Sequence, residues 1–310
     1  DRSLTRFGAT PFKGWNVGFD HLKLSGSEGG ADVLTLNAKS DKADLFFRQQ
    51  RMGDQFNELT SLMQFERQQL GTISGLDRTD FGMNLNFGKG KSLKVATLDA
   101  ESPTGGAKRT AIAYRDPKIE VDLNTREVDS GFSNVVQLLD PEKDLLAALR
   151  GYSQRDAKVK WQINSQLRLD AFLADAQSDP LSQSSYIRNF VVDWKPDAKT
   201  SVNVLRMQNK QSDPLQTLFS NLTEKITLAR DFGRLGKVMF FNETQNFEGT
   251  NNQFSDFTRQ YLAYETKLDA KTGLRTEQTR TRYQNGEQEN ISANTLTTEI
   301  SKKVGVSVTD

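Results

Sequence analysis

Acidic side chains that recur at a fixed spacing are the first candidates for chemistry in this sequence. Glu66, Glu142 and Glu224 become equivalent when the chain is shifted by 76 and then by 82 residues, and each is followed by a basic residue. A repeated carboxylate can serve a site, but an acidic residue also stabilises the first turn of a helix by about 0.3–1 kcal/mol. The shared context favours repeated helix starts, and no acid pair has a context that indicates a glycosidase-type dyad.

Two other features resemble functional motifs. His21 is the only histidine, so a base or metal ligand there would lack a histidine partner, and we expect a histidine on a strand surface. The segment 88–92 (GKGKS) lacks the upstream glycine and the following helix of a phosphate-binding loop, which favours a hairpin turn. We therefore assign no catalytic, cofactor-binding or metal-binding residue and expect no cofactor.

Composition excludes several other classes of function. The chain has no cysteine, so disulfides, thiolate metal sites and cysteine nucleophiles are absent. Its 41 Lys+Arg balance 40 Asp+Glu, and the basic faces lack stacking aromatic residues, so nucleic acid is not an expected partner. Residue 1 is Asp and no signal peptide precedes it, so we expect a processed product or an excerpt of a longer protein.

Alternation of apolar and polar residues is the main structural pattern. It occurs over 81–87, 119–124, 158–163, 167–171 and 190–204, with turn-forming residues between the alternating segments. One apolar and one polar face is typical of antiparallel sheets rather than of buried parallel sheets. We therefore predict a mainly β protein, an antiparallel array of hairpins with polar loops such as 100–108 and 175–185. Whether the sheet is open or closed is left undecided.

Self-similarity of the chain predicts a tandem repeat of about 76–82 residues. The expected units are 1–55 (an incomplete hairpin pair), 56–131, 132–213 and 214–295 (each a helix plus two hairpins) and 296–310 (a truncated unit). The repeat positions are Phe56, Glu66, Leu70, Gly75, Phe132, Glu142, Leu146, Gly151, Glu224, Leu228 and Gly233.

Short helices are predicted in alternate long connections, near 57–74, 134–150 and 217–231. The middle one has the clearest signals: Asp140 as cap, Pro141 in the first turn and Gly151 as a left-handed stop. Helices this short are unstable alone in water, so their leucine faces are expected to dock on the sheet.

The main functional prediction is a non-catalytic scaffold of the cell envelope, the cell surface or an extracellular assembly. It rests on the repeat and on the lack of any reactive constellation. Open strand edges would then drive self-association or binding of a protein partner.

The alternative is a bacterial outer-membrane β-barrel, or part of one, in which case a membrane becomes the partner. Tight turns alternating with longer loops favour it. Most strands offer about three outward apolar residues, whereas an apolar band about 25 Å tall needs more. Arg206 continues the side of Val202 and Val204, segment 273–282 has no apolar face, and Tyr and Trp are few. A β-rich polysaccharide-active enzyme is a third possibility.

Overall fold

The computed structural model describes residues 2–26, 29–54, 75–132, 151–179, 181–250, 255–268, 272–301 and 304–309 of the 310-residue chain. It is nearly all β. Eighteen strands belong to one sheet, and the described helical structure is a single 3-10 turn, η3 (Gly233–Leu235). The predicted mainly antiparallel β fold is confirmed.

The chain divides into two compact units. Unit 1 comprises residues 1–158 and 174–184, and unit 2 comprises 159–173 and 185–310. The strands up to the division are β1 (Arg2–Ala9), β2 (Asn16–Gly26), β3 (Gly29–Lys39), β4 (Ala43–Met52), β5 (Asp77–Gly88), β6 (Lys91–Ser102), β7 (Gly105–Arg115), β8 (Ile119–Val128), β9 (Tyr152–Gln162) and β10 (Leu167–Ser178). The strands of unit 2 that follow are β11 (Gln183–Asp197), β12 (Thr200–Ser212), β13 (Thr217–Asp231), β14 (Lys237–Glu248), β15 (Phe257–Lys267), β16 (Thr272–Tyr283), β17 (Gln288–Ser301) and β18 (Val304–Thr309).

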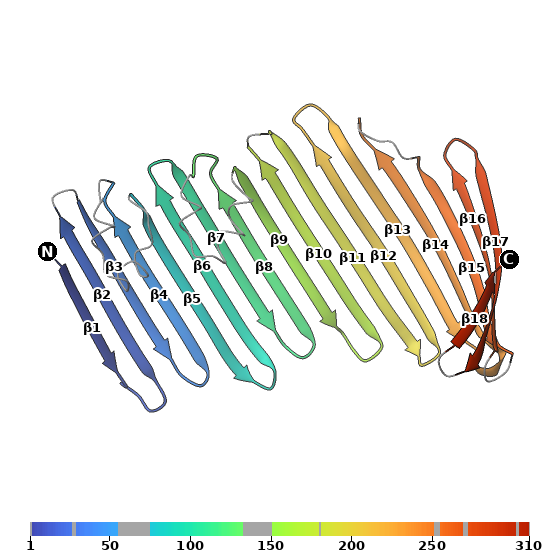
Figure 1. The fold of residues 1–310 in the computed structure, drawn as a ribbon, viewed down its shortest axis with the longest axis horizontal. Helices are drawn as coiled ribbons and strands as arrows, with labels where there is room; N and C mark the ends of the chain where they lie inside the picture. Colours follow the sequence, from blue (N-terminus) through green and yellow to red (C-terminus); the bar gives the residue numbers. More distant parts are fainter. Residues whose placement is uncertain are drawn as a thin grey trace. The chain divides into compact units, whose positions relative to one another are not determined.

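Within each unit every strand pairs antiparallel with the strand next to it in the chain. Each successive pair from β1 to β8 and from β12 to β18 is antiparallel, with register shifts only near the strand ends of β5–β6, β12–β13 and β17–β18. Figure 1 shows this up-and-down order, in which the connections that precede β2, β4, β6 and β8 lie at one end of unit 1. We call that end the turn end and the opposite one the loop end.

The β5–β6 hairpin shows why the sequence folds in this way. Lys89 and Gly90 both have positive φ, 52° and 75°, which is the backbone of the tight turn that matches the twist of a β-ribbon. Apolar Met83 and Leu85 face Val95 and Leu93 across the pair. The interpretation of segment 88–92 as a hairpin turn is confirmed.

Strand registers sort the side chains of unit 1 onto two faces. One face carries a row formed by Leu45, Met83, Val95, Ile112 and Leu123, one residue from each of β4 to β8. We call it the belt face. The opposite face carries a row of Arg48, Asp80, Leu98, Arg109 and Arg126, and we call it the charged face.

The loop end of the charged face holds the buried core of unit 1. One cluster contains Leu22, Leu24, Ala31, Val33 and Met52, and the other contains Leu76, Leu98, Ala100, Ala107, Val128 and Phe132. Phe132 is fully buried, and such burial stabilises by about 1.5–3 kcal/mol. The backbone amide of Phe132 donates to Asp129, whose carboxylate accepts from Gly106 at 2.7 Å, so this segment is fixed against β7.

Two segments, 217–231 and 100–108, differ from their predicted structure. The helix predicted over 217–231 is wrong, because these residues form β13, in which Glu224, Ile226 and Leu228 share one face. The loop predicted over 100–108 is also wrong. Strand β6 extends to Ser102 and β7 begins at Gly105, so most residues of this polar segment belong to strands. The helices predicted near 57–74 and 134–150 lie outside the described residues.

The repeat and its boundaries stay a prediction. Of its positions, Phe56, Glu66, Leu70, Glu142 and Leu146 lie outside the described residues. Gly75, Gly151 and Gly233 all have positive φ, between 66° and 69°, which is a conformation that favours glycine. Glu224 and Leu228 lie in β13.

Candidate functional site

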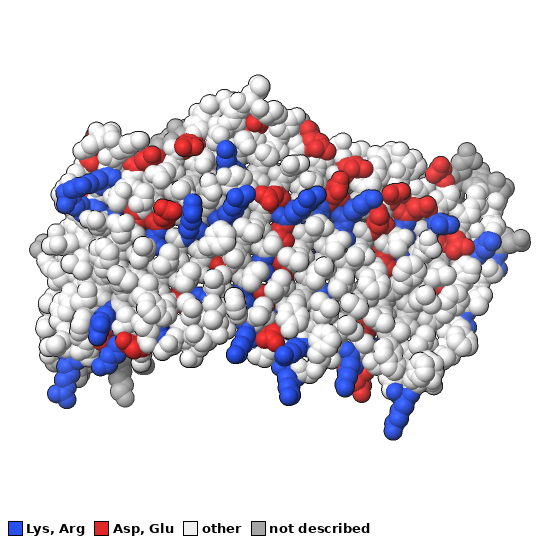
Figure 2. All heavy atoms as spheres, turned by 180° about the vertical axis from the view of Figure 1, so that it is seen from behind, with Lys and Arg blue, Asp and Glu red and all other residues white. Residues whose placement is uncertain are grey.

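The belt face of unit 1 is uncharged over three successive levels of the sheet. The level nearest the turn end contains Ala43, Leu85, Leu93, Tyr114 and Val121, and the level nearest the loop end contains Phe47, Phe81, Thr97, Thr110 and Thr125. The row of Val95 lies between them. Figure 2 shows a face with a broad, largely uncharged band that separates a row of acidic and basic side chains from basic side chains along one rim.

Charged residues begin immediately beyond the belt, toward the loop end. Asp99, Lys108 and Glu127 form the next level of the same face. The Lys108 ammonium lies 3.5 Å from Asp99 and 3.6 Å from Glu101, and these side chains are about half exposed or more. A water-exposed row of mixed charge therefore borders the belt on this side.

The charged face carries ionic groups at the same depth as the belt. Lys94 and Asp122 flank Ala113 in one row, and a bidentate contact joins the Arg115 guanidinium to Asp122 at 2.7 and 2.9 Å. Nearer the loop end, Asn124 donates to Asp156 at 2.8 Å. Side chains that are adjacent in one strand thus point to opposite faces, one uncharged and the other charged.

A buried ion pair lies at the centre of the charged face. Arg78 Nε is 2.7 Å from Asp80 Oδ2, and the two side chains are only 7% and 12% exposed. Removal of one member of such a pair leaves a buried charge without compensation. This pair therefore fixes the local arrangement of β5.

Unit 2 also has one apolar face and one polar face. Its apolar face carries Val204, Ile226, Leu228, Phe240 and Leu262. Its other face carries the ion pair of Lys225 with Glu243 at 3.6 Å and a bonded group in which Tyr261 donates to Glu277 at 2.8 Å and accepts from Arg275 at 2.7 Å.

In the sequence, Arg206 counted against a membrane-spanning band because it continues the apolar side of Val202 and Val204. It is paired with Glu224 at 3.4 Å on the apolar face of unit 2, one level beyond Val204 and Ile226 and farther from the turn at 198–199. Both side chains are more than half exposed. The charge therefore borders the apolar stretch of unit 2 and does not interrupt it.

Aromatic side chains with a polar edge gather near the turn end of the apolar surfaces. Tyr114 lies on the belt face two residues before the β7–β8 turn, and Tyr264 lies beside Val238 on the apolar face of unit 2. Trp194 follows Asp193, which bonds Asn203 of the polar face, so alternation turns Trp194 to the apolar face. Trp161 alternates in the same way with Lys160, and both tryptophans are more than 40% exposed.

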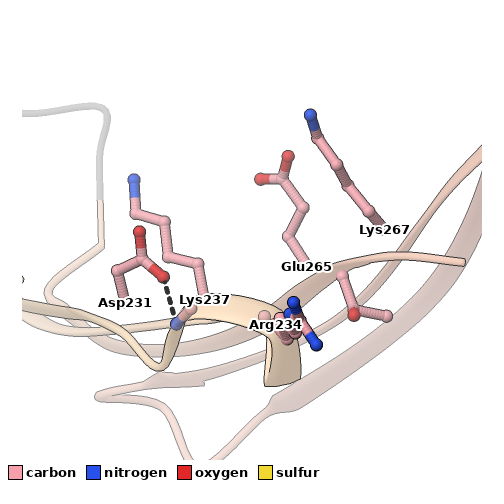
Figure 3. Close-up of a pocket in the computed structure, with 8 residues that line it drawn as sticks. Asp231, Arg234, Lys237, Glu265 and Lys267 are labelled. Carbon is pink, nitrogen blue, oxygen red and sulfur yellow. Dashed lines mark hydrogen bonds between the residues drawn. The ribbon is translucent and has the colours of Figure 1, made fainter. Parts of the chain in front are cut away.

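A wide hollow in unit 2 lies beside the connection between β13 and β14 and the end of β15. Figure 3 shows Lys237, Glu265 and Lys267 extending from its rim, with Asp231 beside Lys237. The hollow encloses about 750 Å³, and the backbone amide of Gly233 donates to Asp231 at 2.7 Å. The charged groups that line it are exposed to solvent, so they form a hydrated rim and not an enclosed binding site.

Two turn aspartates have lowered pKa values. In the β7–β8 turn, the backbone amide of Lys118 donates to Asp116 at 2.9 Å and lowers the pKa of its carboxyl, helped by the ammonium of Lys91. Between β12 and β13, the amides of Leu215 and Gln216 donate to Asp213 at 2.8 Å each and lower its pKa. These carboxylates close the turns in their ionised form.

His21 lies in β2 with its Nε2 3.1 Å from Asp32 Oδ2, and its side chain is one-third exposed. Among the described residues no group of three or more His, Asp or Glu side chains is placed to hold a metal ion. In the described part of the chain, no helix is long and apolar enough to cross a membrane.

The sequence analysis did not single out the arginines of the charged face. The Arg-x-Asp pattern at 78–80, in a segment of alternating residues, was the available signal.

No protein-family model and no curated protein matches this sequence. Several solved structures are similar in fold. A bacterial polysaccharide outer membrane secretin matches at 8% identity and a TM-score of 0.31, over 89% of this chain and 93% of that one. OmpTdeltaL8 is a loop-deletion mutant of an outer membrane protein of Vibrio cholerae. It matches at 12% identity and a TM-score of 0.37, over 76% of this chain and 85% of that one. OccK11 (OpdR) of Pseudomonas aeruginosa matches at 11% identity and a TM-score of 0.37, over 94% of this chain and 91% of that one.

The prediction of a structural scaffold is wrong. The secretin and OmpT, whose structures resemble this chain, are outer-membrane proteins by description. One sequence argument against a membrane band counted only the apolar residues of each strand. Strands β3 to β8 are 10 to 12 residues long, against about 9–11 residues for a membrane-spanning strand, and uncharged threonines extend the belt face. Self-association stays a prediction.

Proposed function

We propose that this chain is an outer-membrane β-barrel protein, or part of one, whose belt face contacts lipid and whose charged face contacts water. It would act in transport or as a pore in the cell envelope. Lipid cannot hydrogen-bond to backbone, so a membrane-spanning sheet must pair every strand and turn its uncharged face outward.

The observation that carries the proposal is the difference between the two faces at one depth of unit 1. Val95 and Ile112 lie in an uncharged row that crosses five strands, while the next residues, such as Lys94 and Asp122, place charges on the other side. A soluble sheet with one wet face buries its other face against a second layer. Here the belt residues Phe81 and Leu123 are 37% and 41% exposed.

The aromatic residues at the turn end support the same orientation. Tyr and Trp are enriched where a bilayer meets water, because their rings are apolar and their edges donate hydrogen bonds. Tyr114, Trp161, Trp194 and Tyr264 all occupy apolar faces near turns. Basic residues such as Lys89 and Lys118 lie in the turns beyond the belt.

Fluorescence quenching from the lipid tests the proposal. Two single-tryptophan proteins would be made after Trp15, Trp161 and Trp194 are replaced by Phe: Ile112→Trp on the belt face and Ala113→Trp on the charged face. After folding into phosphatidylcholine vesicles, we expect brominated acyl chains to quench the tryptophan at 112 strongly. Aqueous iodide should quench the tryptophan at 113 instead.

The neighbouring positions make the comparison a matched one, because they share a strand, a depth and a fold. Equal quenching of both tryptophans by brominated lipid would contradict the proposal. So would a folded chain that stays monomeric in buffer without detergent and does not enter the vesicles.

A further inference from the structure

The turn end of unit 1 carries a lysine in each of its connections. In chain order, the lysines of the connections that precede β2, β4, β6 and β8 are Lys13, Lys42, Lys89 and Lys118. All four are exposed, and none forms an ion pair within the part of the chain that the structure describes. Figure 2 shows basic side chains that project from this rim, the lower edge of the view.

Carboxylates at the turn end do not balance these lysines. The same four connections contain two aspartates, Asp41 and Asp116. The carboxylate of Asp116 already lies 3.2 Å from the ammonium of Lys91, and at the neighbouring strand ends Lys39 lies 4.0 Å from Asp44. Asp41 therefore remains as the one carboxylate that opposes the four connection lysines, which leaves three positive charges in excess.

The backbone holds these lysines at the tips of tight turns. The amide of Lys118 donates to the carboxylate of Asp116 at 2.9 Å, and the amide of Lys42 donates to the hydroxyl of Ser40 at 3.3 Å. Lys89 occupies the two-residue turn between β5 and β6 with a φ of 52°. Local bonds of this kind close turns. The lysines are therefore fixed parts of the rim.

The rim lies at the depth of lipid headgroups when the belt lies in hydrocarbon. Lys118 follows three residues before Val121, and Lys89 four residues after Leu85, both in the level of the belt nearest the turn end. At about 3.3 Å per residue, these separations are about 10–13 Å along the strand, and strand tilt shortens the depth. The headgroup layer on each side is about 5–8 Å thick, and a lysine stem extends to keep its ammonium there.

The opposite border of the belt differs in charge. In β6 and β7, the ammonium of Lys108 lies within 3.6 Å of both Asp99 and Glu101, and Glu127 of β8 lies in the same level as Asp99. Carboxylates therefore outnumber the cation at this border in the strands that carry Lys89 and Lys118 at their other end. The excess of positive charge marks one end of the belt.

We propose that the turn end of unit 1 binds the phosphate groups of anionic phospholipids and so lies in the leaflet that is richer in them. The argument is complementarity of charge, because the unpaired ammonium groups lie where the headgroups would be. Each basic residue near an anionic membrane surface strengthens the attraction about fivefold. The inference rests on the proposed function, since it needs the belt in lipid, and it adds the class of lipid and the direction of insertion.

Quenching by brominated lipids of two headgroup classes tests this inference. Tyr114→Trp, made after the three native tryptophans are replaced by Phe, reports from the level of the belt nearest the turn end. The full chain is folded into vesicles of equal parts phosphatidylcholine and phosphatidylglycerol, in which one or the other carries bromine close to the headgroup. We expect brominated phosphatidylglycerol to quench severalfold more than brominated phosphatidylcholine at low salt. High salt should bring the ratio toward one.

Charge variants locate the preference at the turns beside the probe. In the double variant Lys89→Gln with Lys118→Gln, the quenching ratio should fall at least by half. Lys89→Arg with Lys118→Arg keeps both charges and should keep the ratio. The matched control, Lys23→Gln with Lys108→Gln, removes two exposed cations from the loop end and should behave as the native chain does. Far-ultraviolet circular dichroism checks that every variant has folded.

The outcomes separate this inference from the proposed function. Equal quenching of the native chain by both lipids would assign the lysines to water or to an acidic protein and would overturn this inference alone. An equal fall of the ratio in the turn-end and loop-end variants, or a fall in the arginine variant, would also overturn it. Lack of quenching by either lipid means that the belt is not in the bilayer, which contradicts the proposed function and this inference together.

Discussion

The two faces of unit 1 are built from the same strands but follow different rules. On the belt face, the rows of Val95 and Phe81 contain no charge, and their side chains are left partly exposed. On the charged face, Arg78 and Asp80 are almost completely buried and are paired. The charged face also holds the buried apolar clusters at its loop end, so burial in unit 1 is concentrated on this face, whereas the uncharged belt face is the more exposed one.

The largest expected effect comes from breaking the ion pair of the charged face. Asp80→Ala leaves Arg78 buried without its carboxylate, and we expect the free energy of unfolding to fall by about 3–5 kcal/mol. Urea titration of the protein folded in vesicles measures this change. The matched control is Asp99→Ala, which removes an exposed partner of Lys108 at the border of the belt and should cost much less, because water already screens this pair. Equal losses in the two variants would mean that the faces do not differ in polarity.

A charge introduced into the belt should have the next largest effect. Ile112→Arg places a guanidinium among Val95 and Leu123, and we expect a loss of about 2–4 kcal/mol in vesicles, the cost of a cation near the middle of a bilayer. Ala113→Arg adds the same group beside Asp122 on the charged face and should change stability much less. If the two variants unfold at the same urea concentration, the belt does not face lipid.

The turn carboxylates should give the smallest effect, and it should depend on pH. Their folded-state pKa values are lowered, so the stability they contribute is present above the unfolded pKa of about 3.9 and is lost as pH falls through the folded value. The native chain should therefore lose stability below about pH 4 more steeply than the double variant Asp116→Asn with Asp213→Asn. Urea midpoints measured from about pH 3, below the unfolded pKa of an aspartate, to about pH 7, well above it, test this. Parallel profiles would contradict it.

Much of the sheet was predictable from the sequence, because period-two alternation is a local signal. The hairpin of β5 and β6 and that of β11 and β12 were found in this way. Segment 217–231 was misassigned because the repeat alignment made Glu224 and Leu228 equivalent to residues of a predicted helix, whereas its threonines favour the strand that the structure shows.

The charged face was not predictable, because it depends on register between strands that are distant in the chain. Arg48 faces Asp80 across β4 and β5, which more than twenty residues separate. A slip of one residue would turn all these side chains to the belt face. The sequence contains the residues but no signal of their alignment. The scaffold prediction failed for a related reason, since threonines that extend the belt were counted as polar.

Pairing of each strand with its chain neighbour has a consequence for how the protein forms and how it can change. Contacts between residues close in sequence are quick to make, so growth can start at one hairpin, such as β5–β6, and add the next strand by zipping. Gain or loss of a whole hairpin keeps the inward and outward sense of every remaining residue. Gene duplication could therefore widen or narrow this sheet two strands at a time while the belt face and the charged face stay on their own sides.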